Sequence, residues 1–368
     1  MRFPNIRPID FVSRRDRESR ERYKDSNNYE YTIGIVGSGG VGQKTLENLV
    51  KLSEPETDYR KIKEVYFFYN TSGKSSDKKD KYEGFANSLK PTRKMAVNDI
   101  SAIDFRDFEQ YRESIDICVI AIDNTEANKK HKEEQRRISE APKREIMSEN
   151  NLGLIKDLAE KFNGYDKSVV IVTNQTDEMT YVFDLYSGID ADKMVGMNQT
   201  DTRRFHNFIF DYLRENGQSL EDIHDIEAYM LGSHSPLAFV AASKMRISKV
   251  RQELNEIPRY KGFIEYIEAK TRDFGPSIYK SGWHTDSDTA DATVDVILSI
   301  ISETYVVGVS RFCKVEGSRG LFIGYPTFFE NFKAIPIDCY SDGWFEGLHY
   351  EEKLAFFKGY DHLEQRLD

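Results

Sequence analysis

Three glycines near the start of the chain have the spacing of a phosphate-binding turn. Gly37, Gly39 and Gly42 form G-x-G-x-x-G between the β-branched run 32–36 and an apolar helical pattern that begins near residue 46. In such a turn the first glycine adopts a φ that side chains disfavour, the second lets a pyrophosphate approach the backbone, and the third lets the helix pack on the strand. The helix N-terminus then faces the phosphates. The stretch predicts a dinucleotide site formed by Gly37, Ser38, Gly39, Gly40, Val41 and Gly42.

The same residues nearly form a P-loop, which keeps a phosphate-hydrolysing function open. That motif requires a lysine directly after its second glycine, whereas here Gln43 precedes Lys44. One extra residue rotates Lys44 by roughly 100° about the helix axis, so its amine should turn away from a β/γ-phosphate. The apolar run 116–122, with Asp123 at its end, is the second feature that this NTPase interpretation needs.

Strand and helix patterns alternate after the glycine turn. Apolar runs at 64–69, 116–122 and 169–172 predict buried strands, and the spacing of apolar residues over 145–162 predicts a helix. This alternation predicts an α/β fold with a Rossmann-type parallel sheet, whose ligand crevice lies at the C-terminal ends of the strands.

Four more residues lie at the C-terminal ends of predicted strands and are therefore expected in the cofactor site: Tyr69, Asn70, Ile122 and Asp123. A dinucleotide fold usually ends its second strand with an acid that binds the adenosine ribose, but here the strand ends in Tyr69 and Asn70. Because this strand end lacks a carboxylate that would repel a 2′-phosphate, NADP is expected as readily as NAD. The other interpretation of the polar residues that follow is a solvated turn.

Composition excludes several classes of partner. The formal net charge of −10 argues against nucleic acid or an anionic membrane surface, and no apolar run is long enough for a transmembrane helix. Neither a signal peptide nor a transit peptide is expected, so the prediction is cytoplasmic. The cysteines Cys118, Cys313 and Cys339 lack C-x-x-C spacing, which predicts buried or semi-buried thiols and no metal site. The acidic run 284–291 resembles a calcium loop only superficially and is expected to cap a helix that begins near residue 293.

Three segments divide the chain. Residues 1–30 are a charged extension, 31–183 form the predicted dinucleotide-binding domain, and 184–368 form a predicted C-terminal α+β domain for substrate and catalysis. The charged insertion 124–142 is expected to be helical, either as a mobile flap over the site or as an exposed helix.

Motifs in the second half resemble the lactate/malate dehydrogenase family over roughly residues 31–330. VVIVTNQTDEMTYV (169–182) is similar to the family's strand with N-P-V-D, and SGIDADKMVGMNQTDTRRF (187–205) to its L-D-x-x-R-F helix. MLGSHSPLAFVAASKM (230–245) resembles the G-x-H-G-D active-site loop, and GSRGLFIGYP (317–326) a late hairpin.

The resemblance implies five catalytic residues. His234 corresponds to the catalytic histidine, Asp201 to the carboxylate that orients it, and Arg204 to the arginine that binds the substrate carboxylate. Asn174 corresponds to the asparagine that hydrogen-bonds the substrate, and Arg144 to the mobile-loop arginine. The residue types suit these roles, because positions 201 and 204 share a helix face, a guanidinium matches a carboxylate, and a carboxylate stabilises a protonated histidine.

The chain also departs from the family's pattern. Gln175 replaces the proline after Asn174, which removes the usual basis for a cis peptide there. Ser235 and Pro236 follow the histidine in place of Gly-Asp, and Asp123 stands where a small glycine normally lies against the cofactor.

The sequence therefore predicts a nicotinamide-dependent oxidoreductase acting on a 2-oxo/2-hydroxy carboxylic acid. Its expected cofactor is NAD or NADP, its expected assembly is a homodimer or homotetramer, and no metal, nucleic acid or membrane is expected to bind. The alternatives are a binding or scaffold protein with this fold whose site has decayed and, less favoured, the P-loop-type NTPase.

Overall fold

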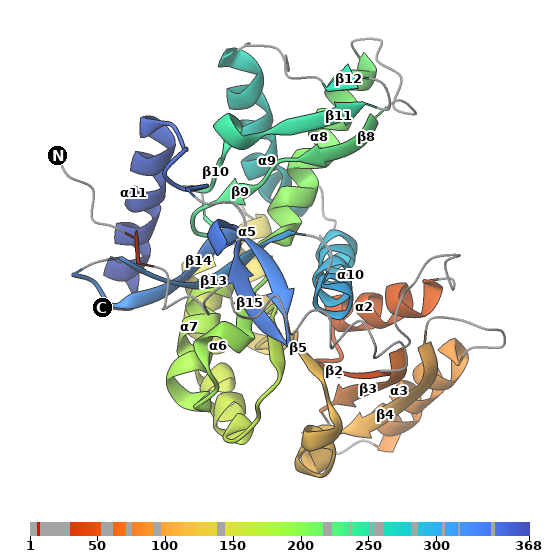
Figure 1. Ribbon diagram of the computed structural model, residues 1–368. Coiled ribbons are helices and arrows are strands. Elements are labelled where there is room, and N and C mark those ends of the chain that lie inside the picture. The colour runs from red at the N-terminus through yellow and green to blue at the C-terminus, as the bar shows by residue number, and fades with distance from the viewer. Residues whose placement is uncertain are drawn as a thin grey trace.

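The fold is seen in a computed structural model (Figure 1). It describes residues 6–7, 30–52, 62–70, 76–90, 97–137, 144–215, 223–235, 237–249, 252–253, 261–280, 286–303, 306–315, 317–339 and 343–368. The predicted extension 1–30 lies almost entirely outside the described residues.

Six parallel strands form the centre of the molecule. They are β2 (Tyr31–Val36), β3 (Ile62–Tyr69), β4 (Val97–Asp104), β5 (Ile117–Ile120), β6 (Ser168–Ile171) and β7 (Met194–Gly196). Their spatial order is β4-β3-β2-β5-β6-β7, with every neighbouring pair parallel. This is the strand order 3-2-1-4-5-6 of the doubly wound dinucleotide-binding fold, so the predicted Rossmann-type sheet is confirmed.

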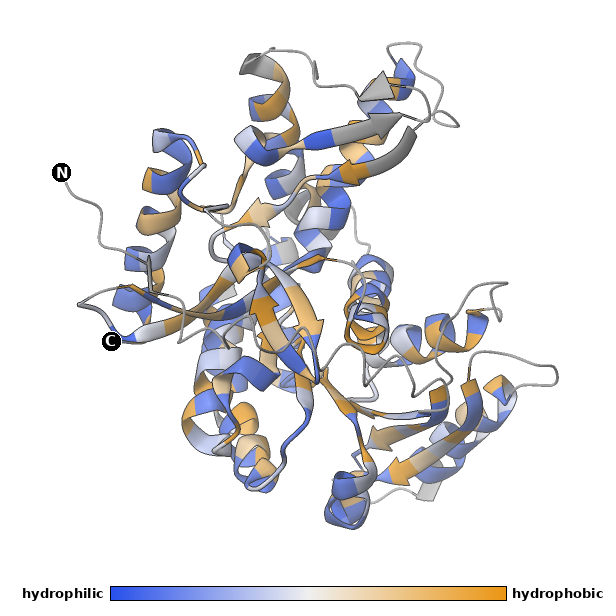
Figure 2. Ribbon diagram, in the orientation of Figure 1, coloured by the Kyte–Doolittle hydropathy of each residue, from blue (hydrophilic) through white to orange (hydrophobic). Residues whose placement is uncertain are grey.

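Alternating side chains of the central strands enter two different cores. Ile33 and Ile35 of β2 lie in a cluster on one face of the sheet, while Val36 lies in the cluster on the other face. Both faces are buried because helices cover each of them, which explains the continuous apolar runs of these strands. Figure 2 shows helices that carry hydrophobic and hydrophilic residues together, as expected for elements with one buried face.

Helices enclose the sheet on both sides (Figure 1). The longer ones are α2 (Gly40–Lys51), α3 (Ser76–Leu89), α5 (Thr125–Arg137), α6 (Arg144–Ala159), α7 (Thr176–Ser187), α8 (Gln199–Glu215), α9 (Lys261–Lys280), α10 (Asp286–Ser302) and α11 (Tyr350–Leu367). Shorter pieces are η2 (Phe105–Asp107), α4 (Phe108–Tyr111), η3 (Arg112–Ser114), η4 (Glu160–Phe162), η5 (Ala191–Lys193), η7 (Ala242–Lys244) and η8 (Ile337–Cys339). The helices α2 and α10 contribute to the first core, α6 and α7 to the second.

Antiparallel strands from the second half extend the same sheet. β13 (Val307–Val315) pairs with β7, then with β14 (Gly320–Glu330), which pairs with β15 (Lys333–Pro336); β1 (Ile6–Arg7) pairs with β13. The hairpin expected over 317–326 is therefore confirmed. Because β7 lies beyond residue 183, the parallel sheet continues into the predicted C-terminal domain, and the division into two domains stays a prediction.

The remaining strands lie beside α8 and α9. They are β8 (Ile223–Glu227), β9 (Met230–Leu231), β10 (Phe239–Val240), β11 (Arg246–Lys249) and β12 (Gln252–Glu253), which form one three-stranded and one two-stranded sheet. Residues of α8, α9 and these strands share a third core, and α11 packs with β13 and β14 in a fourth.

Two local predictions need correction. α10 begins at Asp286, not near residue 293, because the acidic residues form the first turns of the helix instead of preceding it. Cys118 and Cys313 are buried as predicted, whereas Cys339 is exposed. Within the described ranges no helix has the length and apolarity to cross a membrane.

Candidate active site

The glycine turn has the geometry that the sequence predicts. Gly37 has a φ of +128°, and a Cβ there would lie 2.2 Å from the carbonyl oxygen of Ala121. Over Gly39, by contrast, an added Cβ would meet no heavy atom of the described chain within 4 Å. Gly39 is also the N-cap of α2, and the first turn of that helix contains no acidic residue. An open backbone surface at a helix N-terminus suits the pyrophosphate of a dinucleotide.

The ends of β3 and β5 show a mixed outcome for the predicted cofactor residues. Tyr69 is buried and stacks on Tyr82 with ring centroids 5.3 Å apart, so its ring belongs to the core. Asn70 is exposed at the end of β3, and Ile122 is half-buried against the second core. Asp123 accepts a hydrogen bond from Asn128 of α5, whose proximity directs the carboxylate toward that helix.

Lys44 does not reach over the glycine turn. Its Nζ lies 2.9 Å from a carboxylate oxygen of Glu47 one turn further along α2. Hydrogen bonding to Glu47 raises the pKa of Lys44. This orientation agrees with the rotation expected from the extra residue and gives no support to a P-loop.

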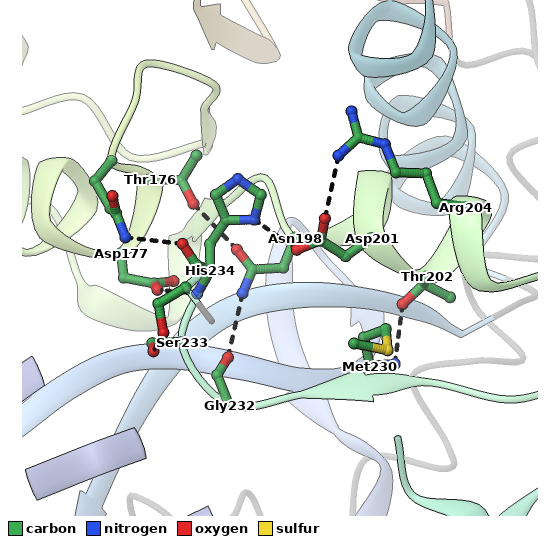
Figure 3. A network of polar contacts seen from close by, with 12 residues as sticks. Thr176, Asp177, Asn198, Asp201, Thr202, Arg204, Met230, Gly232, Ser233 and His234 are labelled. Atoms are coloured by element: carbon green, nitrogen blue, oxygen red, sulfur yellow. Dashed lines mark hydrogen bonds and ion pairs between the residues drawn. The ribbon is translucent and has the colours of Figure 1, made fainter. Parts of the chain in front are cut away.

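Three predicted catalytic side chains, from α8 and from the loop after β9, meet in the structure. The Nδ1 of His234 lies 2.6 Å from Oδ2 of Asp201, and Nη1 of Arg204 lies 3.4 Å from Oδ1 of the same carboxylate. Figure 3 shows Asp201 between the imidazole and the guanidinium. All three residues are buried, so they interact in surroundings of low dielectric constant where charge pairs are strong. Since Asp201 engages Nδ1, the ring presents Nε2 away from that carboxylate.

The backbone of His234 is fixed by two residues that follow β6. The amide N–H of His234 donates to Oδ2 of Asp177 at 2.5 Å, and its carbonyl accepts from Nε2 of Gln175 at 2.8 Å. Asp177 is fully buried, and this burial raises its pKa to about 6. Neither residue was predicted to have this role, because each lies nearly sixty positions from the histidine in the chain.

A close backbone approach places the histidine loop against the sheet. Gly232 exchanges backbone hydrogen bonds of 3.1 and 2.9 Å with Gly324 of β14. A Cβ at Gly324 would lie 2.5 Å from the carbonyl oxygen of Gly232, so a side chain there would push the loop away. Asn198, which precedes α8, donates to the same carbonyl and accepts from Thr176 (Figure 3).

Asn174 is connected to α5 and α6 by carboxamide side chains. The peptide between Asn174 and Gln175 is cis, although no proline follows Asn174. Asn151 of α6 donates to the carbonyl oxygen of Asn174 at 2.8 Å and accepts from the amide of Asn124 and the side chain of Asn128. The helix predicted in the insertion 124–142 is therefore confirmed, with Asn128 buried.

Arg144 is the first residue of α6, and its side chain lies outside the described residues. Its predicted contact with substrate stays a prediction. Among the residues that the structure does describe, no group of three histidine, cysteine, aspartate or glutamate side chains could hold a metal ion.

Two acidic residues of α10 lie at the site and were not predicted to do so. Oδ2 of Asp288 lies 3.1 Å from Nε of Arg204. Oδ2 of Asp286, on the same first turn, would be 2.0 Å from a Cβ on Gly40. The amino end of α10 thus contacts both Arg204 and the glycine turn, which brings the two halves of the site together. The acidic run 284–291 was the available signal, but it was interpreted as a cap.

Fold and site together define a Rossmann-type protein with a glycine turn at a helix N-terminus and a buried carboxylate–histidine pair. No family model matches the sequence. The chain is 26% identical over 306 residues to the malate dehydrogenase of Chlorobium luteolum, covering 80% of this chain and 86% of that protein. It is 28% identical over 186 residues to the L-lactate dehydrogenase of Macrococcus caseolyticus, a match that spans 48% of this chain and 56% of that protein.

Solved structures show the same fold. The minor L-lactate dehydrogenase of Enterococcus mundtii superposes with a TM-score of 0.69 at 18% identity, covering 92% of this chain and 98% of that one. The malate dehydrogenase of Plasmodium falciparum superposes with a TM-score of 0.67 at 22% identity, covering 92% of this chain and 97% of that one. The curated relatives and the matching solved structures are thus lactate and malate dehydrogenases at low sequence identity, and the chain shares their fold.

Proposed function

We propose that this protein is a nicotinamide-dependent oxidoreductase that interconverts a 2-hydroxy and a 2-oxo carboxylic acid. The observation that carries the proposal is the bonded series His234–Asp201–Arg204, which Asp288 connects to α10, the helix that also contacts the glycine turn. It combines a proton donor, a carboxylate that orients it, and a cation, which are the groups that reduction of a 2-oxo acid requires.

The residues divide the reaction between them. When bound, the nicotinamide supplies the hydride that reduces the carbonyl carbon. His234 donates a proton from Nε2 to the carbonyl oxygen, while Asp201 holds the ring in one tautomer and stabilises the imidazolium. Arg204 binds the substrate carboxylate, and Asn174 hydrogen-bonds the substrate. We propose that Arg144 stabilises the developing alkoxide and that movement of 124–144 excludes water.

The cofactor residues follow from the glycine turn. The backbone over Gly39 and the amino end of α2 would hold the pyrophosphate. Asn70 directly follows β3, near the position where a ribose-binding acid would otherwise stand, so we propose that the site accepts NADP as well as NAD. A cytoplasmic location and a homodimer or homotetramer stay predictions.

Titration of the purified protein with NADH and NADPH, followed by assay against pyruvate, oxaloacetate and longer 2-oxo acids, tests the proposal. We expect enhanced dinucleotide fluorescence on binding and loss of reduced-dinucleotide absorbance with at least one acid. His234→Ala should abolish turnover and retain dinucleotide binding. A folded protein that binds neither dinucleotide would instead support the decayed scaffold, and Mg-ATP binding that is lost in Lys44→Ala would support the NTPase.

A further inference from the structure

The guanidinium of Arg204 is already held by two carboxylates. Nε donates to Asp288 at 3.1 Å and Nη1 donates to Asp201 at 3.4 Å. A carboxylate binds a guanidinium bidentately through either the Nε/Nη2 edge or the Nη1/Nη2 edge. One donor of each edge is thus engaged by the protein's own residues. A substrate carboxylate gains a bidentate contact only when one of these carboxylates moves.

Asp288 is the carboxylate that can move. Asp201 is buried and bonded to His234, whereas the side chain of Asp288 is 35% exposed. Asp288 also lies in the first turn of α10, where a helix stabilises a negative charge. It can therefore turn from Arg204 toward a ligand.

No second described cation is bonded to Asp288. Arg203, the neighbouring arginine on α8, faces α10 but lies 2.6 Å from Asp295 and 3.7 Å from Asp291. When a substrate carboxylate binds the guanidinium of Arg204, the carboxylate of Asp288 remains beside the substrate as a second negative charge. Two like charges that compete for the one buried guanidinium disfavour each other. A plain 2-oxo or 2-hydroxy monocarboxylate therefore binds this site poorly.

We propose that Asp288 selects a substrate that carries an ammonium group in addition to its carboxylate. Arg204 takes the carboxylate, and Asp288 turns to accept hydrogen bonds from the ammonium, so that the bound zwitterion restores the charge balance of the site. The substrate class is an amino-substituted 2-hydroxy acid and its 2-oxo partner. This inference rests on the proposed function, since it names the substrate of that same site.

The reaction itself is unchanged by the ammonium group. In the direction of oxidation the hydride leaves C2 for the oxidised nicotinamide, the hydroxyl proton passes to His234, and the C–O bond becomes a carbonyl. The substrate loses two electrons and the dinucleotide gains them. The ammonium is a recognition group and keeps all its bonds.

Initial rates with NAD⁺ and NADP⁺ test the inference on the full chain. The probes are 3-amino-2-hydroxypropanoate and 4-amino-2-hydroxybutanoate, compared with lactate and malate. We expect kcat/KM for an amino-substituted acid to exceed that for lactate by about tenfold or more. Asp288→Asn should lower kcat/KM for the amino-substituted acid and raise kcat/KM for lactate, so that the preference is reversed.

Asp291→Asn is the matched control. Asp291 lies one turn further along α10 and accepts from Asn48 of α2, so its replacement should leave the substrate ratio as in the parent protein. Unchanged far-ultraviolet circular dichroism and melting temperature show that both variants are folded.

The outcomes separate the inference from the proposed function. Preference for lactate or malate in the parent protein, with a ratio that Asp288→Asn does not alter, overturns the inference and leaves the proposed function standing. Gain of lactate activity in Asp288→Asn without turnover of either amino-substituted acid also overturns it. Absence of both dinucleotide binding and turnover overturns the two together.

Discussion

Three contacts hold His234, one on its imidazole and two on its backbone. Asp201 holds Nδ1, Asp177 accepts from the backbone amide, and Gln175 donates to the backbone carbonyl. A proton donor must be held within a fraction of an ångström of its productive position. The polar residues after β6 and at the start of α8 would supply that precision for the proposed proton transfer, without themselves touching a substrate.

Replacement of Asp201 by asparagine tests the role of its charge. The amide has nearly the same shape, but it cannot stabilise an imidazolium and it permits the wrong tautomer. We expect kcat with the best 2-oxo acid to fall by about 10²- to 10⁴-fold while dinucleotide affinity changes little. Asp211→Asn, on the exposed part of α8 beside Arg214, is the control and should keep full activity. Equal losses in both variants would remove Asp201 from the mechanism.

Asp177 predicts a pH dependence of stability. Burial raises its pKa from 3.8 to about 6, so between these values the folded state binds more protons than the unfolded state. The free energy of unfolding therefore falls as the pH rises through this window. The variant Asp177→Asn lacks the titration and should gain about 2 to 3 kcal/mol relative to the parent between pH 4 and pH 7.

Urea unfolding at several pH values measures this gain. The exposed Asp166, whose side chain is 81% accessible, supplies the control variant Asp166→Asn, for which the difference from the parent should stay constant. A constant difference for Asp177→Asn as well would show that its carboxylate titrates normally.

Among the elements, the long periodic ones were predictable and the short or polar ones were not. The strands around the glycine turn and the helix over 145–162 have unbroken apolar patterns, and the structure has them at nearly those bounds. β7 has only three residues, too few to show a period, and the first half of α3 is mostly charged, so its helical apolar pattern is confined to residues 82–89. Their positions are set by tertiary pairing with β6 and with the outer strands.

The same reasoning explains the outcome for the site. Asp201, Arg204 and His234 were predictable because each lies in a motif with a resemblance to a known pattern. Asp288 is bonded to Arg204 although the two residues are 84 positions apart in the chain. It lies in the first turn of α10, and the acidic run there gave no clear signal of where that helix begins. Patterns local in sequence carry no information about such a partner, because the packing of α10 on α8 creates the contact.

The charged insertion is fixed at one point, which gives a prediction for α5. Asn151 is fully buried and binds the amide of Asn124, the side chain of Asn128 and the carbonyl of Asn174. Asn151→Ala removes these three hydrogen bonds and should lower the free energy of unfolding by about 2 to 3 kcal/mol. Hydrogen exchange should accelerate in α5 and little elsewhere.

Glu149→Ala, on the exposed face of α6, is the control for that experiment. It should change stability by less than about 0.5 kcal/mol. If Asn151→Ala leaves exchange in α5 unaltered, the carboxamide contacts do not hold that helix.

At the scale of the whole molecule, the two halves of the chain share cores as well as a sheet. Val307 and Val309 of β13 lie in the same cluster as β2 and α2, and Phe322 of β14 lies in the cluster formed with β5 and β6. The backbone pairing of Ser310 with Gly196 continues the sheet from β7 into β13. The sequence boundary near residue 183 therefore does not separate two independent cores.

This sharing predicts one cooperative unfolding transition. Phe322 is fully buried, and Phe322→Ala should lower the free energy of unfolding by about 3 to 5 kcal/mol. Far-ultraviolet circular dichroism reports on the whole chain, and in a Trp283→Phe background the fluorescence of buried Trp344 reports on the core around α11. Both signals should shift together, while Leu185→Ala, at a residue that is 59% exposed, should shift neither. Two separate transitions, or a stable fragment that ends at Gly196, would show that the dinucleotide-binding half folds alone.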